Sequence, residues 1–211
     1  MEQPEILQTA SDGLNYVFID APEIIAVLKQ RLGQHPKFSQ IAFIDGNCNE
    51  VIGNAVNRLP PDHLTLAFID PTGLQIQFET IRRLVHNRKV DLLMTIQFGM
   101  GIRMNLPQYL QTQGAALTGF LGNTELRDDS QQGGSISQMA LRVVARYMKQ
   151  LEALVYITVR DCEVPIHNDQ TNALLYYMVL ASRHQRGEDF WRKITKIRSS
   201  GQRVLDLGGA E

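Results

Sequence analysis

One short apolar segment, which ends in an acid and a proline turn, constrains the fold of this chain more than any other. Residues 63–73 read HLTLAFIDPTG, and the run from Leu64 to Ile69 is apolar except for Thr65. Such a run is typical of a strand buried on both faces of a parallel sheet. Ligands of open α/β sheets bind beyond the carboxyl ends of the strands. Asp70 is therefore a candidate site residue; the alternative is that it caps the helix that follows.

Strand-like and helical patterns alternate around this segment. Apolar runs predict strands at residues 14–20, 40–46, 63–70 and 90–98, and helical spacing predicts helices at residues 22–32, 47–59 and 77–87. Strand–helix units of this kind predict an α/β fold with a mostly parallel sheet, doubly wound or Rossmann-like, because crossover connections are right-handed.

The second half of the chain has a different pattern. Residues 99–135 are expected to form a mobile, loop-rich excursion with at most one or two short helices, and residues 136–154 to form a helix. Two further apolar runs, at residues 154–159 and 173–180, predict an antiparallel hairpin because the connection between them is short and rich in turn residues. A last helix is expected at residues 188–198. The whole chain, 1–211, is interpreted as one domain with a tail at residues 201–211.

Composition excludes several classes of protein. The chain has 211 residues, 21 basic and 22 acidic, and this balance argues neither for nor against nucleic-acid binding. Cys48 and Cys162 are too few for a disulfide framework or a zinc site. No segment has the length and apolarity of a membrane span or of a signal peptide, so a cytoplasmic protein without a membrane segment is expected.

Several segments resemble one family. They are FID at 18–20, GNCNEV at 46–51, LAFIDPTGLQIQFETI at 66–81, VDLL at 90–93 and LLYYMVLASRHQRGEDFWRKI at 174–194. They resemble the three-Cys-motif partner proteins (TcmP), methyltransferase-like proteins of bacteria and archaea whose genes neighbour a three-Cys-motif protein. The resemblance covers about residues 14–197. It implies a class I S-adenosylmethionine (SAM) methyltransferase sheet with strand order 3-2-1-4-5-7-6 and an antiparallel last strand.

The resemblance also implies a cofactor site. Asp20 would accept hydrogen bonds from the ribose hydroxyls of SAM. The alternative is that Asp20 caps the helix that begins at Pro22. The turn formed by Gly46, Asn47, Cys48 and Asn49 would contact the adenine. Cys48 is interpreted as a packing residue rather than a nucleophile, since the sequence places no histidine and no basic cluster near it.

The segment Asp70, Pro71, Thr72 occupies the place of the motif that amino-methyltransferases write Asp/Asn-Pro-Pro-aromatic. The acid or amide of that motif accepts hydrogen bonds from the target amine, and the aromatic ring stacks on a flipped base. Thr72 and Gly73 replace the second proline and the aromatic residue here, so the resemblance implies the amine-accepting half alone. Phe78 or Phe98 would supply a ring, unless both belong to the core. A basic run at residues 82, 83, 88 and 89 is expected beside the Asp70 turn, where it would meet phosphate or form a solvated helix end.

The chain departs from the family at its start. Members carry a strand and a glycine-rich cofactor motif before the strand that matches residues 14–20, and only about a dozen residues precede it here. Loss of that central strand would expose two strand edges. The tail reads VLDLGG at 204–209 and could fill the vacant place, as in a circular permutation. The alternatives are a frayed tail, an edge strand elsewhere, or a shortened form of the family.

Two functional hypotheses follow. The first is a SAM-dependent methyltransferase, or a degenerate relative, that acts on an amine of a nucleic acid or another substrate. Asp70, Pro71 and Thr72 would form its acceptor site. The second is a non-catalytic subunit that keeps the fold and binds a partner, such as the three-Cys-motif protein, through residues 99–135.

Overall fold

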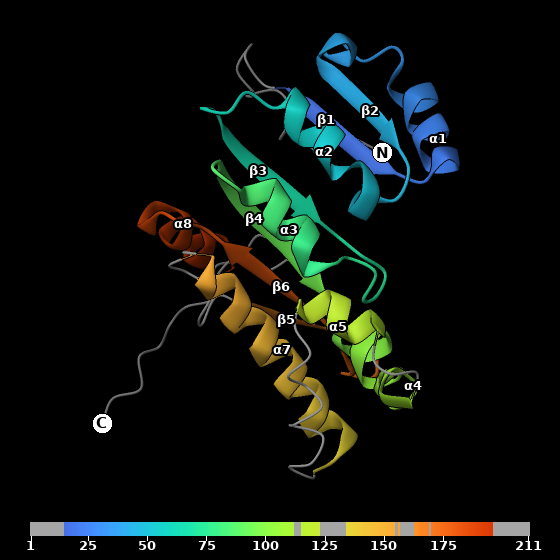
Figure 1. Cartoon of the computed structure of the whole chain (residues 1–211), viewed down its shortest axis with the longest axis vertical. Helices are drawn as coiled ribbons and strands as arrows, with labels where there is room; N and C mark the ends of the chain where they lie inside the picture. The colour runs from blue at the N-terminus through green and yellow to red at the C-terminus, as the bar shows by residue number, and fades with distance from the viewer. Residues whose placement is uncertain are drawn as a thin grey trace. The chain divides into compact units, whose positions relative to one another are not determined.

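The computed structural model describes residues 15–111, 115–122, 134–154, 156, 163–168 and 170–195 (Figure 1). The fold is mixed α/β, with parallel strand pairs and two antiparallel pairings. The chain divides into two compact units, Met1–Pro60 and Pro61–Glu211. A single domain over 1–211 stays a prediction. The tail 201–211, and the expected strand at 154–159 apart from Leu154 and Tyr156, lie outside the described residues.

The first unit is a two-stranded parallel sheet with two helices. Its elements are β1 (Tyr16–Asp20), α1 (Pro22–Leu32), the short helix η2 (Phe38–Gln40), β2 (Ile41–Asp45) and α2 (Cys48–Arg58). The pairing runs in register from Tyr16 opposite Ile41 to Asp20 opposite Asp45. Proline in the first turn of α1 and an asparagine cap before α2 define the two helix starts. The strands and helices predicted here are therefore confirmed.

The core of the first unit lies mainly between the sheet and its helices. Ile25 of α1, Ile44 of β2, and Ile52 and Ala55 of α2 are buried. On the face of β2 opposite Ile44, the ring of Phe43 lies 5.8 Å from the ammonium of Lys29 in α1 and 5.9 Å from the ring of Phe18 in β1. Alternate residues of β2 therefore serve the two faces of the sheet.

The second unit is built on a four-stranded sheet. Its strands are β3 (Leu64–Ile69), β4 (Lys89–Ile96), β5 (Glu163–His167) and β6 (Leu174–Ala181), in the order β3-β4-β6-β5. β3 and β4 are parallel, and β6 is antiparallel to both of its neighbours. This order agrees with the 4-5-7-6 part of the expected sheet, with the last strand antiparallel.

The predicted hairpin has a different first strand. The segment between the two predicted strands is expected to be a short, turn-rich connection, but it contains β5, which pairs with β6. β5 contains Pro165. A proline is tolerated there because β5 is an edge strand, in which backbone donors on one side need no partner strand.

Helices cover both faces of this sheet. They are α3 (Phe78–Val85), the π-helical turn η3 (Phe98–Arg103), α4 (Leu106–Gln111), α5 (Ala115–Leu121), α7 (Ile136–Ala153) and α8 (Gln185–Thr195). Trp191 of α8 packs with Leu180 and Leu93, whereas the neighbouring Leu92 is fully buried on the opposite face. Ser135 and Gln138 form a capping box at the start of α7. None of the described helices is long and apolar enough to cross a membrane.

The described part of the expected excursion is more helical than predicted. Residues 98–111 and 115–121 form η3, α4 and α5, and the side chains of Ile102, Leu106, Leu117, Phe120 and Leu121 are buried. α5 contacts both α3 and α7. The prediction of a loop-rich segment with at most two short helices is therefore wrong for these residues; residues 123–133 lie outside the description.

β3, the strand predicted to be buried on both faces, has one exposed face. Leu64, Leu66 and Phe68 are 74%, 63% and 60% exposed, and they share one face of β3. Phe68 is in register with Leu93, which α8 covers, so this face is covered over the neighbouring strand only. Within the described residues β3 pairs with β4 alone and β1 pairs with β2 alone. The outer edge of β1 and the outer edge of β3 are thus without a partner strand among the described residues.

Candidate cofactor and acceptor sites

Two carboxylates lie side by side at the carboxyl end of the β1–β2 sheet. Asp20 and Asp45 are the last residues of the two strands and stand in register. The amide of Gly46 donates a 3.0 Å hydrogen bond to the carbonyl of Asp20, which continues the pairing past the strand ends. Both aspartates are exposed. Adjacent carboxylates accept hydrogen bonds from hydroxyl or amino groups of a ligand, as the acid at this place does in dinucleotide folds.

Asp20 also has a local role. Its Oδ1 accepts a 2.7 Å hydrogen bond from the amide of Ala21, the N-cap residue of α1. The alternative that Asp20 caps the helix is wrong, because Ala21 is the N-cap residue, the bond goes to its own amide rather than to a first-turn amide, and α1 has no side-chain cap. A carboxylate has about four lone-pair positions, so one backbone bond leaves capacity for a ligand hydroxyl.

The turn of residues 46–49 has a defined geometry. Gly46 has φ +133, and a Cβ at this position would lie 3.0 Å from Cγ1 of Val51. The positive φ favours glycine, and a Cβ would in addition be a tight fit against the Val51 side chain. The side chain of Asn47 accepts a 3.0 Å hydrogen bond from the amide of Asn49 and caps α2. The amide oxygen of Asn47 is thus used by the helix, which is a role that the resemblance did not imply.

Cys48 is a half-buried free thiol beside this turn. Burial raises the pKa of the Cys48 thiol above its usual value, and the nearby carboxylate of Asp20 adds to the rise, against two backbone hydrogen bonds that lower it. A thiol with a raised pKa is a poor nucleophile near neutral pH. The interpretation of Cys48 as a packing residue agrees with this environment.

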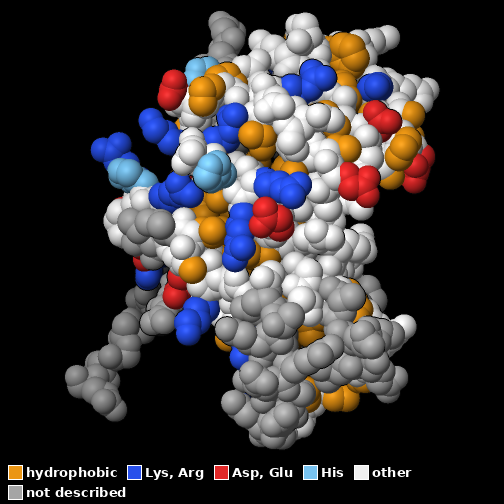
Figure 2. Space-filling model, in the orientation of Figure 1, with side chains coloured by type: hydrophobic (Ala, Val, Ile, Leu, Met, Phe, Trp, Pro, Cys, Tyr) orange, Lys and Arg blue, Asp and Glu red, His pale blue; other side chains and the backbone are white. Residues whose placement is uncertain are grey.

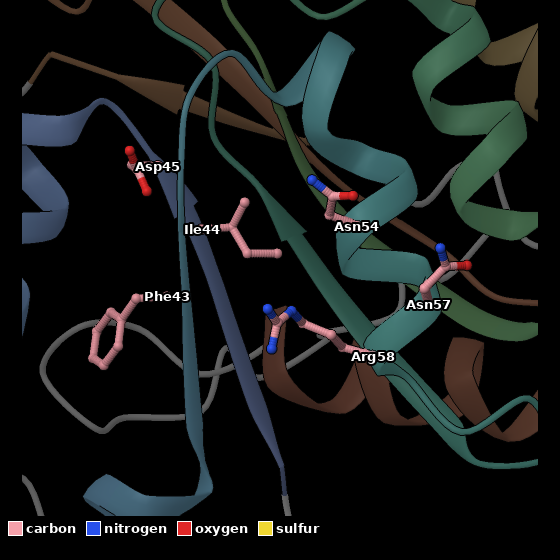
Figure 3. A pocket seen from close by; sticks show the side chains of 6 residues that line it. All are labelled: Phe43, Ile44, Asp45, Asn54, Asn57 and Arg58. Carbon is pink, nitrogen blue, oxygen red and sulfur yellow. The ribbon is translucent and has the colours of Figure 1, made fainter.

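A pocket of about 470 Å³ opens between β2 and α2 (Figure 3). Its lining residues are Phe43, Ile44, Asp45, Asn54, Asn57 and Arg58. Ile44 points toward α2 and Phe43 points to the other side of the strand (Figure 3). None of the five predicted cofactor residues lines this pocket. Of the two carboxylates at the carboxyl end of the β1–β2 sheet, only Asp45 lines it.

The second site lies at the carboxyl end of β3. Asp70 follows the last residue of the strand, and its Oδ1 accepts a 2.5 Å hydrogen bond from the hydroxyl of Thr95 on β4. α3 begins at Phe78 with Gln77 as its N-cap residue. The alternative that Asp70 caps the next helix is therefore wrong, because the helix starts several residues later and Asp70 is bound to a neighbouring strand.

The turn after Asp70 is packed tightly against η3. A Cβ on Gly101 would lie 3.3 Å from Cα of Gly73, and a Cβ on Gly99 would lie 2.8 Å from the carbonyl of Leu174. The π-helical turn is therefore fitted between the Asp70 turn and the start of β6. Thr72 accepts a 2.9 Å hydrogen bond from the side chain of Gln75. π-Helical turns occur often at functional sites.

Neither candidate aromatic ring is available to stack on a ligand. Phe78 is buried and lies edge-on to Tyr147, with ring centroids 5.6 Å apart. Phe98 is buried and lies edge-on to Tyr177 at 5.8 Å. Both rings belong to the core, as the alternative held.

The basic run lies at the other end of the sheet. Lys89 starts β4 and is in register with Leu64, the first residue of β3, whereas Asp70 follows Ile69 at the last pair. The expectation that residues 82, 83, 88 and 89 lie beside the Asp70 turn is wrong, because α3 carries them back to the amino end before β4 begins.

Two site residues, Asp45 and Thr95, were not predicted from the sequence. Asp45 had a visible signal, since Phe-Ile-Asp recurs at 18–20, 43–45 and 68–70. Thr95 had none, because its contact with Asp70 depends on the register of β3 and β4. Among the described residues no group of histidine, cysteine and acidic side chains could hold a metal ion.

Comparison with protein-family models, curated proteins and solved structures finds no match.

Proposed function

We propose that this chain is a class I methyltransferase-like protein that binds SAM and presents Asp70 to an amine acceptor. The observation that carries the proposal is the recurrence of an acid at the carboxyl ends of β1, β2 and β3, together with the antiparallel β6 inserted between β4 and β5. Open α/β folds bind their ligands at the carboxyl ends of the strands, which is where these carboxylates lie. Membership of the three-Cys-motif partner family is part of the proposal.

Asp20 and Asp45 fit the adenosyl part of SAM. The ribose hydroxyls and the adenine amino group are donors, and the two exposed carboxylates are acceptors at adjacent strand ends. Gly46 and Asn47 shape the turn beside them. None of these residues is assigned to the methionyl part of the cofactor. When bound, SAM supplies an electrophilic methyl group.

Asp70 fits an amine acceptor. Thr95 holds one oxygen of the carboxylate through a hydrogen bond, and the remaining lone pairs accept N–H groups of an incoming amine. A carboxylate that accepts these bonds orients the amine and favours its loss of a proton as a new bond forms at nitrogen. Pro71 and Thr72 shape the turn, and no ring stacks on the acceptor from Phe78 or Phe98.

The melting temperature of the purified chain with and without SAM tests this proposal. Millimolar SAM should raise it, because a ligand that binds only the folded state stabilises that state. The rise should vanish in Asp20→Ala and persist in Asp62→Ala, a matched exposed aspartate that lies before the amino end of β3 and not at a carboxyl end. No rise for the wild-type chain would contradict the proposal. Loss of the rise on deletion of residues 201–211 would support the permuted tail.

A specific observation favours a second candidate, a non-catalytic subunit that binds another protein. Leu64, Leu66 and Phe68 present a row of exposed apolar side chains on an open strand. Such rows mark association surfaces more often than single exposed apolar residues do. The three-Cys-motif protein is the partner that the resemblance proposes. Co-purification that is lost in Leu66→Lys, with no effect of SAM on melting, would favour this candidate.

A further inference from the structure

Positively charged side chains gather at the amino end of the four-stranded sheet. Figure 2 shows Lys, Arg and His side chains concentrated on one side of the visible face. The cations are Arg82 and Arg83 of α3, Arg88 and Lys89 at the start of β4, and Arg183 and Arg186 after β6, and they are called the amino-end cluster below. All are exposed except Arg88, which is half-buried. The exposed imidazoles of His86 and His184 belong to the same segments, and the exposed imidazole of His63 directly precedes β3.

The topology of the sheet brings these segments together. β3 and β4 start at this end, and β6 finishes here because it is antiparallel to β4, with Ala181 opposite Leu92. α3 ends at Val85, just before β4 begins. Residues that are about a hundred positions apart in sequence, such as Arg88 and Arg183, are therefore neighbours.

Arg183 fixes the two turns to each other. Its guanidinium donates to the carbonyl oxygens of Arg88 at 3.3 Å and Val85 at 3.4 Å, and it lies 5.2 Å from the centre of the Tyr156 ring. Tyr156 in turn donates a 2.7 Å hydrogen bond to the carbonyl of Val90. The turn after α3 and the turn after β6 are thus held as one surface rather than as two independent loops.

Acids lie among these cations but are fewer. Residues 79–91 and 182–193 carry eight Lys and Arg side chains against four acids, which are Glu79, Asp91, Glu188 and Asp189. Glu79 lies 3.9 Å from Arg82 and 3.4 Å from Arg83, and all three side chains are about half exposed. One carboxylate therefore serves two guanidinium groups. Surface ion pairs of this kind contribute at most about 1 kcal/mol, so a multivalent anion can replace them. Because the chain as a whole has a net charge of −1, this local excess is balanced by acids elsewhere.

We propose that the amino-end cluster binds the sugar–phosphate backbone of a nucleic acid. Arginine outnumbers lysine in the cluster, and its planar guanidinium matches two phosphate oxygens at once. Cations on several elements suit a ligand with regularly repeated charges. The residues interleaved with these cations are His86, Asn87, His184 and Gln185, which donate or accept hydrogen bonds and do not insert into hydrocarbon, so an anionic membrane is disfavoured.

Nucleic-acid binding at the amino-end cluster does not require methyl transfer. The cluster lies at the opposite end of β3 from Asp70, about 20 Å along a strand of this length. A nucleic acid would therefore contact the cluster with its backbone several nucleotides away from any base that reaches Asp70. Binding at the cluster can succeed or fail whether or not SAM binds to the first unit.

Fluorescence anisotropy with a labelled oligonucleotide tests the inference, in the absence of SAM. Single-stranded DNA and the duplex of the same sequence are titrated at 50 and 200 mM NaCl. We expect binding of at least one form, and a steep loss of affinity at the higher salt concentration, because binding releases condensed counterions. No binding of either form at 50 mM NaCl would overturn the inference.

A charge-matched pair of variants locates the surface. Replacement of Arg83, Lys89 and Arg186 by Gln should weaken binding at least about tenfold and reduce the salt slope by roughly one for each lost phosphate contact. Replacement of Arg31, Arg142 and Lys149 by Gln, on α1 and α7, should leave binding unchanged. Equal losses in both variants would overturn the inference. So would polyglutamate or anionic vesicles competing as well as DNA at equal charge concentration.

Discussion

Thr95 donates a 2.5 Å hydrogen bond to Oδ1 of Asp70 across the β3–β4 pair. The threonine is buried at the end of β4, and the aspartate is exposed directly after β3. A buried hydroxyl thus fixes the orientation of an exposed carboxylate. In the proposed reaction Thr95 is a positioning residue, since it acts on the acceptor amine only through Asp70.

Thr95→Val should lower kcat/KM for the amine acceptor about tenfold to a hundredfold, because small misplacement of a reacting group has effects of this size. Valine keeps the shape of threonine and removes only the donor. SAM affinity should not change, and steady-state kinetics with a cofactor titration measures both. Thr95→Ser, which keeps the hydroxyl, should retain most of the activity. Equal activity of the Val and Ser variants would contradict the positioning role.

The first four strands, Asp20 and Asp70 could be predicted from the sequence because their signals are local. Apolar runs and helical spacing located β1 to β4, and Asp20 and Asp70 stand directly after such runs. Asp45 also had a local signal, because it belongs to one of the three Phe-Ile-Asp segments. Thr95 had no local signal, because its contact with Asp70 depends on the register of two strands that are distant in sequence.

Two errors have the same physical origin, which is the neighbours of a strand. The segment that contains β5 is predicted to be a turn-rich connection, and Pro165 adds to that pattern, but a proline is tolerated in β5 because this strand has a neighbour on one side only. β3 is predicted to be buried on both faces because five of its six residues are apolar. Its burial depends on which elements cover it, and the run from Leu64 to Ile69 carries no information about them.

Two buried tyrosines should respond oppositely to loss of the hydroxyl group. The hydroxyl of Tyr147 is buried with no partner among the described residues, and burial raises its pKa, whereas Tyr156 donates to the Val90 carbonyl. Tyr147→Phe should keep the ring contacts with Phe120 and Phe78 and raise the free energy of unfolding by up to about 1 kcal/mol, since an unpaired buried hydroxyl is costly.

Tyr156→Phe should lower the free energy of unfolding by about 1–2 kcal/mol, because the Val90 carbonyl loses its donor. Burial raises the pKa of Tyr156 to about 12, so the hydroxyl stays protonated and the bond persists through ordinary pH. Urea denaturation of both variants at pH 7 gives the two values. Equal changes in the two variants would show that the contact with Val90 contributes nothing to stability.

Cys48 should react slowly with alkylating reagents. Its raised pKa means that less thiolate is present at pH 8 than in an unstructured peptide, so iodoacetamide should react more slowly with the folded chain. Cys162→Ser isolates the reaction at Cys48. Asp20→Asn should speed it, because removal of the nearby negative charge lowers the pKa of the thiol. Reaction faster than that of glutathione at pH 7 would contradict this description of the site.

The exposed face of β3 should govern self-association. Leu66→Lys together with Phe68→Lys should reduce oligomer formation in sedimentation velocity and change the free energy of unfolding by no more than about 0.5 kcal/mol, as expected for exposed positions. Leu92→Lys, which places a charge at a fully buried position of β4, is the contrasting control and should abolish folding. Severe destabilisation by the β3 pair would mean that this face is covered in the folded protein.

Isothermal titration calorimetry of the full chain with SAM tests the central claim most directly. We predict saturable binding of one SAM per chain, at least tenfold weaker in Asp20→Ala and in Asp45→Ala, because each variant removes an acceptor for the adenosyl group. Asp62→Ala should bind SAM as the wild-type chain does. The absence of heat at millimolar SAM, or equal affinity in all four proteins, would contradict a cofactor site at the carboxyl ends of β1 and β2.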